Sequence, residues 1–399
     1  MSVFVSIAGL GFLILIHEAG HFFTAIALHM RPRKFYLGFP PALVKTRRRG
    51  IEYGLGTIPL GGYVKIPGMH RPAAVDVEFR LQRAVRDAPQ IAPSLERVKR
   101  LLAAQRYDEA RPAVEELEHE LRRAGQPTEP LADVRDALAP DAYWRAPAWK
   151  RVLVIFAGPG TNLLLAVLLF IVLFVSASGG YRLGFVFGTS KNDTVVPVVQ
   201  SVVRGEPAQR IGLRPGDRIV AVNGERLGAE DIARRIRTSH GTRIALTVER
   251  HGRNITLPRA AARRQERLGV PAATWHSVKL TGDLTKAIGS SLGNLVHRQG
   301  REQVSSPVGI VRGSSQAVKQ GWQDYLWVLA LISLSLALLN LLPLLPLDGG
   351  HIFFSILEGI RGRAVPREVY ERVSAVGIAL VLMLFFIGLS NDVGRLGGG

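Results

Sequence analysis

Two histidines lie one helical turn apart near the start of the chain, with a glutamate beside the first of them. They are His17 and His21, with Glu18, in a run from residue 1 to 29 that contains no Lys or Arg. On a helix both imidazoles face one side and can bind one metal ion, while the carboxylate polarises a water molecule beside it. Ionisable groups in an apolar span are costly and mark a function. The pattern predicts a zinc site; a structural zinc and a proton relay are the alternatives.

Two histidines leave a zinc site incomplete, because a catalytic zinc usually has three protein ligands and an open position. The chain has no cysteine, so the third ligand must be a His, Asp or Glu. Asp348 is the best candidate, within the stretch Asn340–Gly350. Pro343 and Pro346 break the helix there and leave backbone groups without helical hydrogen bonds. Inside a membrane such groups occur only where they are buried in the protein or line a cavity. The alternative is an ordinary helix-end aspartate before two glycines.

Four long apolar runs predict the elements that position these groups. The chain has 399 residues, of which 47% are hydrophobic, and we expect transmembrane helices at 1–29, 150–178, 325–347 and 371–390. This distribution excludes one ordinary soluble globule and a wholly disordered chain. The net charge of +19 could indicate nucleic acid, but beside membrane spans it favours basic loops next to anionic lipid. We therefore expect a lipid bilayer as partner and no nucleic acid.

Basic residues near the ends of the spans set the expected orientation. Those flanking the first two spans are Arg31, Arg33, Lys34, Lys45, Arg47, Arg48, Arg49, Arg145, Lys150 and Arg151, and those before the fourth are Arg361, Arg363, Arg367 and Arg372. Fewer lie close to the membrane at the ends of the loop between spans two and three. Residues 30–150 and 348–371 are thus expected in the cytoplasm, and both termini and residues 180–322 outside.

At this point the sequence resembles the site-2 protease family of intramembrane zinc metalloproteases. The family pattern is HExxH with a distant NxxPxxPLDG, and His17–His21 and Asn340–Gly349 match every fixed position. Phe156–Asn162 matches the GPxxN motif of the second span. Ile58–Val64 matches the membrane-associated β-hairpin after the first span, and Ser306–Ile310 the segment before the third.

The resemblance implies a Zn²⁺ cofactor with three ligands and one general base. His17, His21 and Asp348 would bind the metal, and Glu18 would take the proton of the attacking water and pass it to the leaving amine. Two asparagines, Asn162 and Asn340, resemble polar residues near the family's site.

The side-chain amides of Asn162 and Asn340 could have either of two roles. Side-chain amides can hold the substrate backbone or the developing oxyanion. They can equally form interhelical hydrogen bonds inside a bundle.

A hairpin and an outer domain are expected to handle the substrate. In the region 30–69, Ile51–Met69 alternates apolar residues around Gly61 and Gly62, a pattern that by itself predicts an ordinary hairpin. The family resemblance implies that the edge of this hairpin pairs with an extended substrate. Residues 183–260 resemble a bacterial PDZ domain. Its peptide groove, with a nest for a C-terminal carboxylate, would be formed by Leu183, Gly184, Phe185 and Val186. The alternative for this domain is a rigid spacer, followed by a linker with an amphipathic segment at 261–322.

Residues 70–147 depart from the family pattern. Ser94–Gln105 and Tyr107–Ala124 read as an αα-hairpin, and the second stretch resembles half of a tetratricopeptide repeat. Because a single such unit cannot bury a solenoid core, we expect a small cytoplasmic helical module. A solvated insert is preferred to a flap over the membrane face.

The expected fold class is a polytopic α-helical membrane protein. It has four transmembrane helices, a membrane-associated β-hairpin, an extracytoplasmic PDZ (α/β) domain and a cytoplasmic helical insertion. The resemblance implies a metalloendopeptidase of the bacterial cytoplasmic (inner) membrane that acts in regulated intramembrane proteolysis. It would cut within or near transmembrane segments of single-span regulators such as anti-sigma factors, or of remnant signal peptides. The alternatives are a catalytically silent scaffold that presents its PDZ domain, and a zinc transporter.

Overall fold

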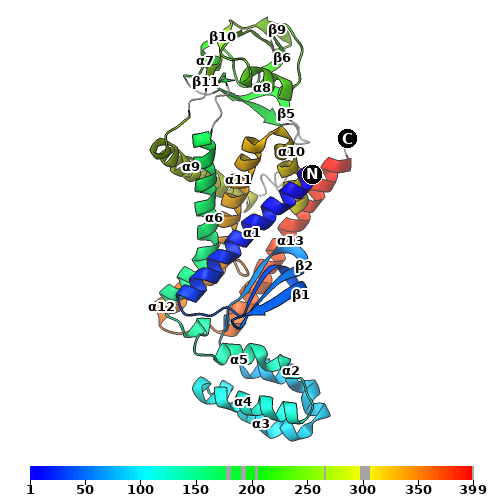
Figure 1. Cartoon of the computed structure of the whole chain (residues 1–399), viewed down its shortest axis with the longest axis vertical. Coiled ribbons are helices and arrows are strands. Elements are labelled where there is room, and N and C mark those ends of the chain that lie inside the picture. The colour runs from blue at the N-terminus through cyan, green and yellow to red at the C-terminus, as the bar shows by residue number, and fades with distance from the viewer. Residues whose placement is uncertain (177–180, 190–194, 203–204, 265–266, 297–305, 398–399) are drawn as a thin grey trace. The chain divides into compact units, whose positions relative to one another are not determined.

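The computed structural model describes residues 1–176, 181–189, 195–202, 205–264, 267–296 and 306–397 (Figure 1). The chain divides into two compact units. The first comprises Met1–Ala166, Ser314–Lys319 and Val328–Phe385. The second comprises Val167–Gly313, Gln320–Trp327 and Phe386–Gly399.

Four helices of the described chain are long and apolar enough to cross a membrane. They are α1 (Ser2–Ala27), α6 (Ala148–Ser176), α11 (Trp322–Asn340) and α13 (Arg367–Gly397). Many of their large apolar side chains are exposed, among them Phe4, Phe23, Leu164 and Phe386. Apolar surface of this extent is suited to hydrocarbon rather than water. The chain is therefore a polytopic membrane protein, as the sequence predicts.

The third span is shorter than predicted. The expected helix 325–347 ends at Asn340 in α11, and a separate helix, α12 (Asp348–Arg361), begins at Asp348. Pro343 and Pro346 lie between the two helices and have no backbone N–H to continue the hydrogen-bond ladder. Asp348 thus opens α12 rather than closing the third span. The fourth helix, expected at 371–390, extends further in both directions as α13.

A small β-sheet follows α1, formed by β1 (Lys34–Arg48) and β2 (Ile51–Lys65). The start of β1 lies between the two halves of β2, because Leu37 is opposite both Leu55 and Gly62. The end of β1 pairs with the first half of β2. The prediction that Ile51–Met69 folds on itself as a hairpin is therefore wrong in its pairing. Alternation of apolar residues indicates a strand and its faces but does not indicate which strand lies beside it.

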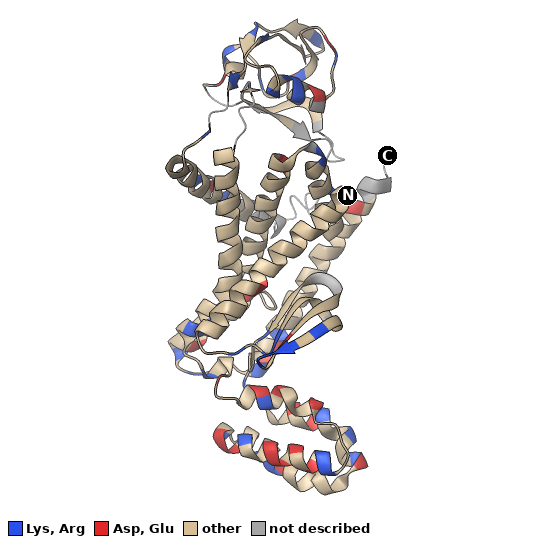
Figure 2. Ribbon diagram, viewed as in Figure 1, with Lys and Arg blue, Asp and Glu red and all other residues tan. Residues whose placement is uncertain are grey.

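The insertion has a hydrophobic core of its own. Its helices are α2 (Ala74–Asp87), α3 (Ala92–Ala103), α4 (Tyr107–Arg123) and α5 (Ala132–Leu138), with single 3₁₀ turns η1 (Pro89–Ile91), η2 (Glu129–Leu131) and η3 (Tyr143–Arg145). The expected αα-hairpin corresponds to α3 and α4. Buried apolar residues from all four helices close the core, including Leu81, Val98, Leu117 and Val134. Both signs of charge are interspersed over these helices (Figure 2).

The second unit contains a five-stranded sheet in the order β4-β5-β6-β8-β9. The strands are β4 (Phe185–Thr189), β5 (Val195–Val202), β6 (Arg218–Val222), β8 (Leu246–Arg250) and β9 (Arg253–Thr256). Two helices, α7 (Pro207–Arg210) and α8 (Ala229–Arg237), contribute to one core with Leu183, Ile219 and Val248. Short two-stranded ladders join β3 (Tyr181–Arg182) to β11 (Arg263–Arg264) and β7 (Arg243–Ile244) to β10 (Ala260–Ala261). Two further helices are α9 (Val270–Val296) and α10 (Pro307–Gln320).

One ion pair with a buried carboxylate connects the turn before β6 to β8. Asp217, only 2% exposed, accepts hydrogen bonds from Nε and Nη2 of Arg250, each at 2.7 Å, and from the backbone N–H of Arg214 at 2.8 Å. Burial alone would raise the pKa of Asp217, but the Arg250 guanidinium and the Arg214 N–H outweigh it and hold the pKa below its ordinary value. The carboxylate is therefore charged throughout the physiological range.

We predict that Asp217→Asn destabilises this domain by about 3 kcal/mol, because it leaves the guanidinium without its counter-charge. Hydrogen exchange of β6 and β8 in the full-length protein measures the loss. Glu225→Gln is the matched control, since it breaks an exposed pair with Arg235 and should change stability by less than about 0.5 kcal/mol. In the native protein the carboxylate stabilises the fold above its unfolded pKa of about 4 and ceases to do so only as pH falls through its lower folded pKa. Equal exchange in the two variants would contradict this assignment.

Candidate metal centre

Three side chains from two distant parts of the chain converge within the first unit. Nε2 of His17 and Nε2 of His21 lie 3.2 Å apart, and Oδ2 of Asp348 lies 3.2 Å from the first and 3.4 Å from the second. Both histidines are buried, at 7% exposure each. Ligand atoms around a tetrahedral zinc with bonds of about 2.05 Å are about 3.3 Å apart. The triangle therefore has the size and the donor types of a His₂–carboxylate zinc site.

The ring of His21 is oriented by α6. Its Nδ1 donates to the carbonyl oxygen of Val154 at 2.9 Å, which leaves Nε2 free to bind a metal. Gly158 faces the same ring, and a Cβ at this position would lie 2.2 Å from Nε2 of His21. The glycine of the predicted GPxxN motif is thus required by the close approach of the imidazole.

The ring of His17 contacts the side chain of Asn162, which is fully buried. The amide Nδ2 lies 3.3 Å from Nδ1 of His17, while the buried Oδ1 meets no hydrogen-bond donor among the residues that the structure describes. Exchanging the two amide atoms lets Oδ1 accept the ring N–H and frees Nε2 for a metal. The backbone oxygen of Asn162 also accepts from Ser333 Oγ of α11 at 2.8 Å. Asn162 therefore lies behind a candidate ligand and not on the cavity, so its predicted contact with substrate stays a prediction.

Glu18 lies directly under the edge of β2. A Cβ at Gly62 would be 2.2 Å from Cγ of Glu18 and 2.9 Å from its Oε1. Only a glycine allows the strand to approach the carboxylate so closely. The second half of β2 and the candidate general base therefore form one surface.

A cavity of about 620 Å³ opens in front of these groups. It is lined by all three candidate ligands and Glu18, and by Gly61, Gly62 and Asn340 among the predicted substrate-binding residues. The chain can thus place a peptide beside the metal centre.

His351 also lines this cavity and was missed by the sequence analysis. It lies three residues after Asp348, so a helix beginning at Asp348 presents both on one face. Burial, assisted by the nearby His70, lowers the pKa of His351 to about 4, so its ring is neutral at neutral pH. The spacing was visible in the sequence, but it indicated a shared face only if a helix began at Asp348.

The predicted PDZ groove residues lie at an edge of the five-stranded sheet. Leu183 is buried in the domain core, and its carbonyl accepts from the N–H of Ala208 at 2.7 Å. Gly184 has a positive φ of 86°, and Phe185 begins the edge strand β4, whose second residue is Val186. An edge strand can add a peptide as a further strand. The side chain of Val186 lies outside the described residues.

The candidate metal centre and the apolar helices are typical of a membrane-embedded metallopeptidase, and comparison with known proteins agrees. The sequence model of peptidase family M50 matches residues 5–384, so the chain belongs to peptidase family M50, the site-2 proteases. It is a zinc metalloendopeptidase. Atu1380 of Agrobacterium fabrum, whose name provisionally assigns it to the zinc metalloproteases, is 28% identical over 98% of this chain and 94% of its own. Regulator of sigma-W protease RasP of Bacillus subtilis is 26% identical over 97% and 96%, respectively.

We predict that Asp348→Ala loses most of its zinc, whereas the native protein in detergent holds about one zinc per chain. The remaining two histidines cannot complete a zinc site. Elemental analysis after dialysis measures the content. Asp87→Ala, at an exposed aspartate of α2, is the control and should keep the native content. Unchanged zinc in Asp348→Ala would mean that another residue is the third ligand.

Gly62→Ala should push β2 away from Glu18 and reduce kcat/KM about 100-fold, the size of effect that a displacement of about 1 Å can have. The zinc content should not change, since the strand supplies no ligand. The assay is chelator-sensitive cleavage of a transmembrane peptide. Gly11→Ala in α1 is the control because a Cβ there meets open space. Native activity in Gly62→Ala would show that the close contact with Glu18 has no role in the reaction.

Proposed function

We propose that His17, His21 and Asp348 hold the zinc of this peptidase. We further propose that Glu18 is the general base for hydrolysis of peptide bonds within or near transmembrane segments. The observation that carries the proposal is the triangle of donor atoms, 3.2–3.4 Å on each side, with Glu18 beside it on a common cavity. The supporting helices α1, α6 and α11 are apolar, so a substrate that reaches the cavity must itself be membrane-embedded or membrane-bound.

Zinc held by His17, His21 and Asp348 would supply a Lewis acid for the scissile carbonyl and would lower the pKa of a nearby water. Glu18 accepts the proton of that water and delivers it to the leaving amine. Asn340 and His351, both on the cavity wall, offer hydrogen bonds to the substrate backbone.

A helical substrate must unwind before it can react, because its peptide groups are engaged in its own hydrogen bonds. The edge of β2 at Gly61–Val64 borders the cavity and can receive the extended segment as an added strand. Backbone pairing of this kind is independent of side-chain identity. It places the scissile bond over Glu18, where the strand approaches most closely.

The proposed substrates are single-span membrane regulators, such as anti-sigma factors, or remnant signal peptides. The name of the relative RasP, regulator of sigma-W protease, supports the first class. We propose that residues 183–260 form a PDZ domain whose open edge strand β4 receives a peptide end. A rigid spacer is the other role for this domain, and peptide titration of the full chain separates the two.

We propose a bacterial inner-membrane location with both termini and residues 183–260 outside and residues 30–150 in the cytoplasm. The support is the concentration of Lys and Arg beside the predicted cytoplasmic ends of the spans. The charged insertion α2–α5 would then lie in the cytoplasm.

The Glu18→Gln variant tests the mechanism. It should retain about one zinc per chain and lose cleavage by 100-fold or more, roughly the contribution of a general base. Glu116→Gln, at an exposed glutamate of α4, is the control and should cut at the native rate. Cleavage by Glu18→Gln at the native rate would remove Glu18 from the mechanism. A native protein that holds zinc and cuts no membrane peptide would favour the silent scaffold.

A further inference from the structure

Two cations lie side by side at the base of the β-sheet. Arg33 precedes β1 and Lys65 ends β2, and the backbone N–H of Arg33 donates to the carbonyl oxygen of Lys65 at 2.7 Å. Like charges on neighbouring strands repel and destabilise the pairing. Glu52, at the same end of the sheet, pairs with Lys34 at 3.3 Å, so the charges of Arg33 and Lys65 must be balanced from elsewhere.

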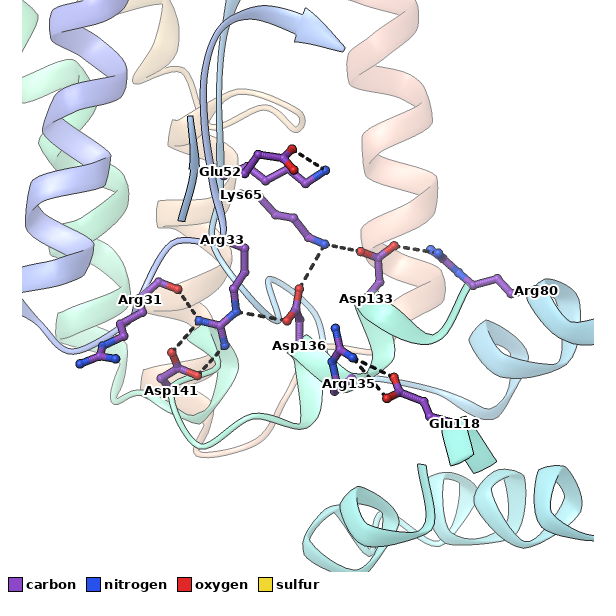
Figure 3. Close-up of polar contacts among 11 residues, drawn as sticks. Arg31, Arg33, Glu52, Lys65, Arg80, Glu118, Asp133, Arg135, Asp136 and Asp141 are labelled. Atoms are coloured by element: carbon purple, nitrogen blue, oxygen red, sulfur yellow. Dashed lines mark hydrogen bonds and ion pairs between the residues drawn. The ribbon is translucent and has the colours of Figure 1, made fainter. Parts of the chain in front are cut away.

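The insertion supplies three aspartates to this pair of cations (Figure 3). Arg33 donates through Nε to Asp136 at 3.1 Å, and through both terminal nitrogens to the two oxygens of Asp141 at 3.0 Å. Lys65 donates to Asp133 at 2.6 Å and lies 3.2 Å from Asp136.

Arg80 of α2 completes the cluster by donating to Asp133 at 2.7 Å. Three acids thus meet three bases. All three acids come from α5 and the turn after it.

Most of these groups are partly shielded from water. The side chains of Arg33 and Lys65 are 26% and 20% exposed, and those of Asp136 and Asp141 are 14% and 23% exposed. Burial alone would lower the pKa of Lys65, but the carboxylates of Asp133 and Asp136 outweigh it and raise the pKa. Shielded, bidentate contacts of this kind are stronger than exposed surface pairs.

Backbone contacts reinforce the same junction. The N–H of Tyr143 donates to the carbonyl oxygen of Pro67 at 2.8 Å, and that of Trp144 to Gly68 at 3.1 Å. The segment that leaves the insertion is thus bound to the segment that follows β2. Lys65 stands three residues after Gly62, which contacts Glu18, so the insertion is fastened to the strand that lines the cavity.

We propose that the insertion 70–147 is a positioning element for proteolysis. Asp133, Asp136 and Asp141 hold Arg33 and Lys65, and through them they fix the cavity edge of β2 over Glu18. The proposal rests on the proposed function of that edge in receiving the extended substrate. Release of the cluster loosens the strand and weakens substrate binding, while the metal ligands, which lie on α1 and α12, remain in place.

The test is the double variant Asp133→Asn/Asp136→Asn, which removes both acidic partners of Lys65 in the full-length protein. KM for a transmembrane peptide should rise about tenfold, as expected for lost hydrogen bonds to charged groups. The zinc content should stay native and kcat should change less than KM. Hydrogen exchange of residues 61–65 should increase. Asp133→Glu/Asp136→Glu keeps the charges and should restore most of both readouts.

Glu116→Gln is the matched control, because it breaks an exposed ion pair with Arg97 within the same insertion. It should leave KM and the exchange of residues 61–65 unchanged. Asp141→Asn is a milder variant, should the double one fail to fold, and is expected to shift the same readouts in the same direction.

Native exchange at residues 61–65 in the double variant would overturn the proposal and leave the insertion a solvated module. If the double variant lost both its zinc and the hydrogen-exchange protection of residues 61–65, the proposal would also be overturned. That result would indicate a general collapse of the fold around the site. The exchange measurement needs no cleavage. It therefore decides the positioning role even if the native protein cuts no peptide and the proposed function fails.

Discussion

The structure depends on a set of polar groups placed inside an apolar bundle. Two imidazoles and a carboxylate within 3.4 Å of one another would be unfavourable there unless each had a defined partner. The surrounding residues supply such partners for the two imidazoles. The Val154 carbonyl accepts from His21, the amide of Asn162 backs His17, and Gly158 leaves room for the ring. The contacts between α1 and α6 therefore hold both candidate ligands in place.

The interruption between α11 and α12 solves the other half of the same problem. A continuous helix would keep Asp348 in line with the third span. Pro343 and Pro346 end the helix, and Asp348 begins a new one. A carboxylate in the first turn of a helix is stabilised by the unpaired backbone N–H groups and the positive end of the helix dipole. The break in the helix therefore places the carboxylate beside the two histidines and favours its charged form.

Local patterns in the sequence were sufficient for the parts of the fold that are set by nearby residues. The spacing of His17 and His21 places both on one helical face, and the apolar runs locate the four long helices. The α3–α4 hairpin follows from its periodicity in the same way. Partnerships over long distances were not visible. Nothing in the alternation of Ile51–Lys65 indicates that Lys34–Leu37 lies between its halves, and His351 joins the cavity only because α12 begins at Asp348.

The same distinction explains why the insertion looked independent in the sequence and is not so in the structure. Its helices are predicted by their own periodicity, and its core is its own. Asp136 and Asp141 are unremarkable in a charged segment until they are placed beside Arg33, about 100 residues earlier in the chain. A protease that binds an extended chain by backbone pairing needs a rigid strand, because any freedom of that strand must be lost when the substrate binds. A sheet with two adjacent cations at its base is poorly suited to that task alone. Under the proposed role of the insertion, the aspartates would fix the strand before the substrate binds, so that binding energy would be available for unwinding the substrate.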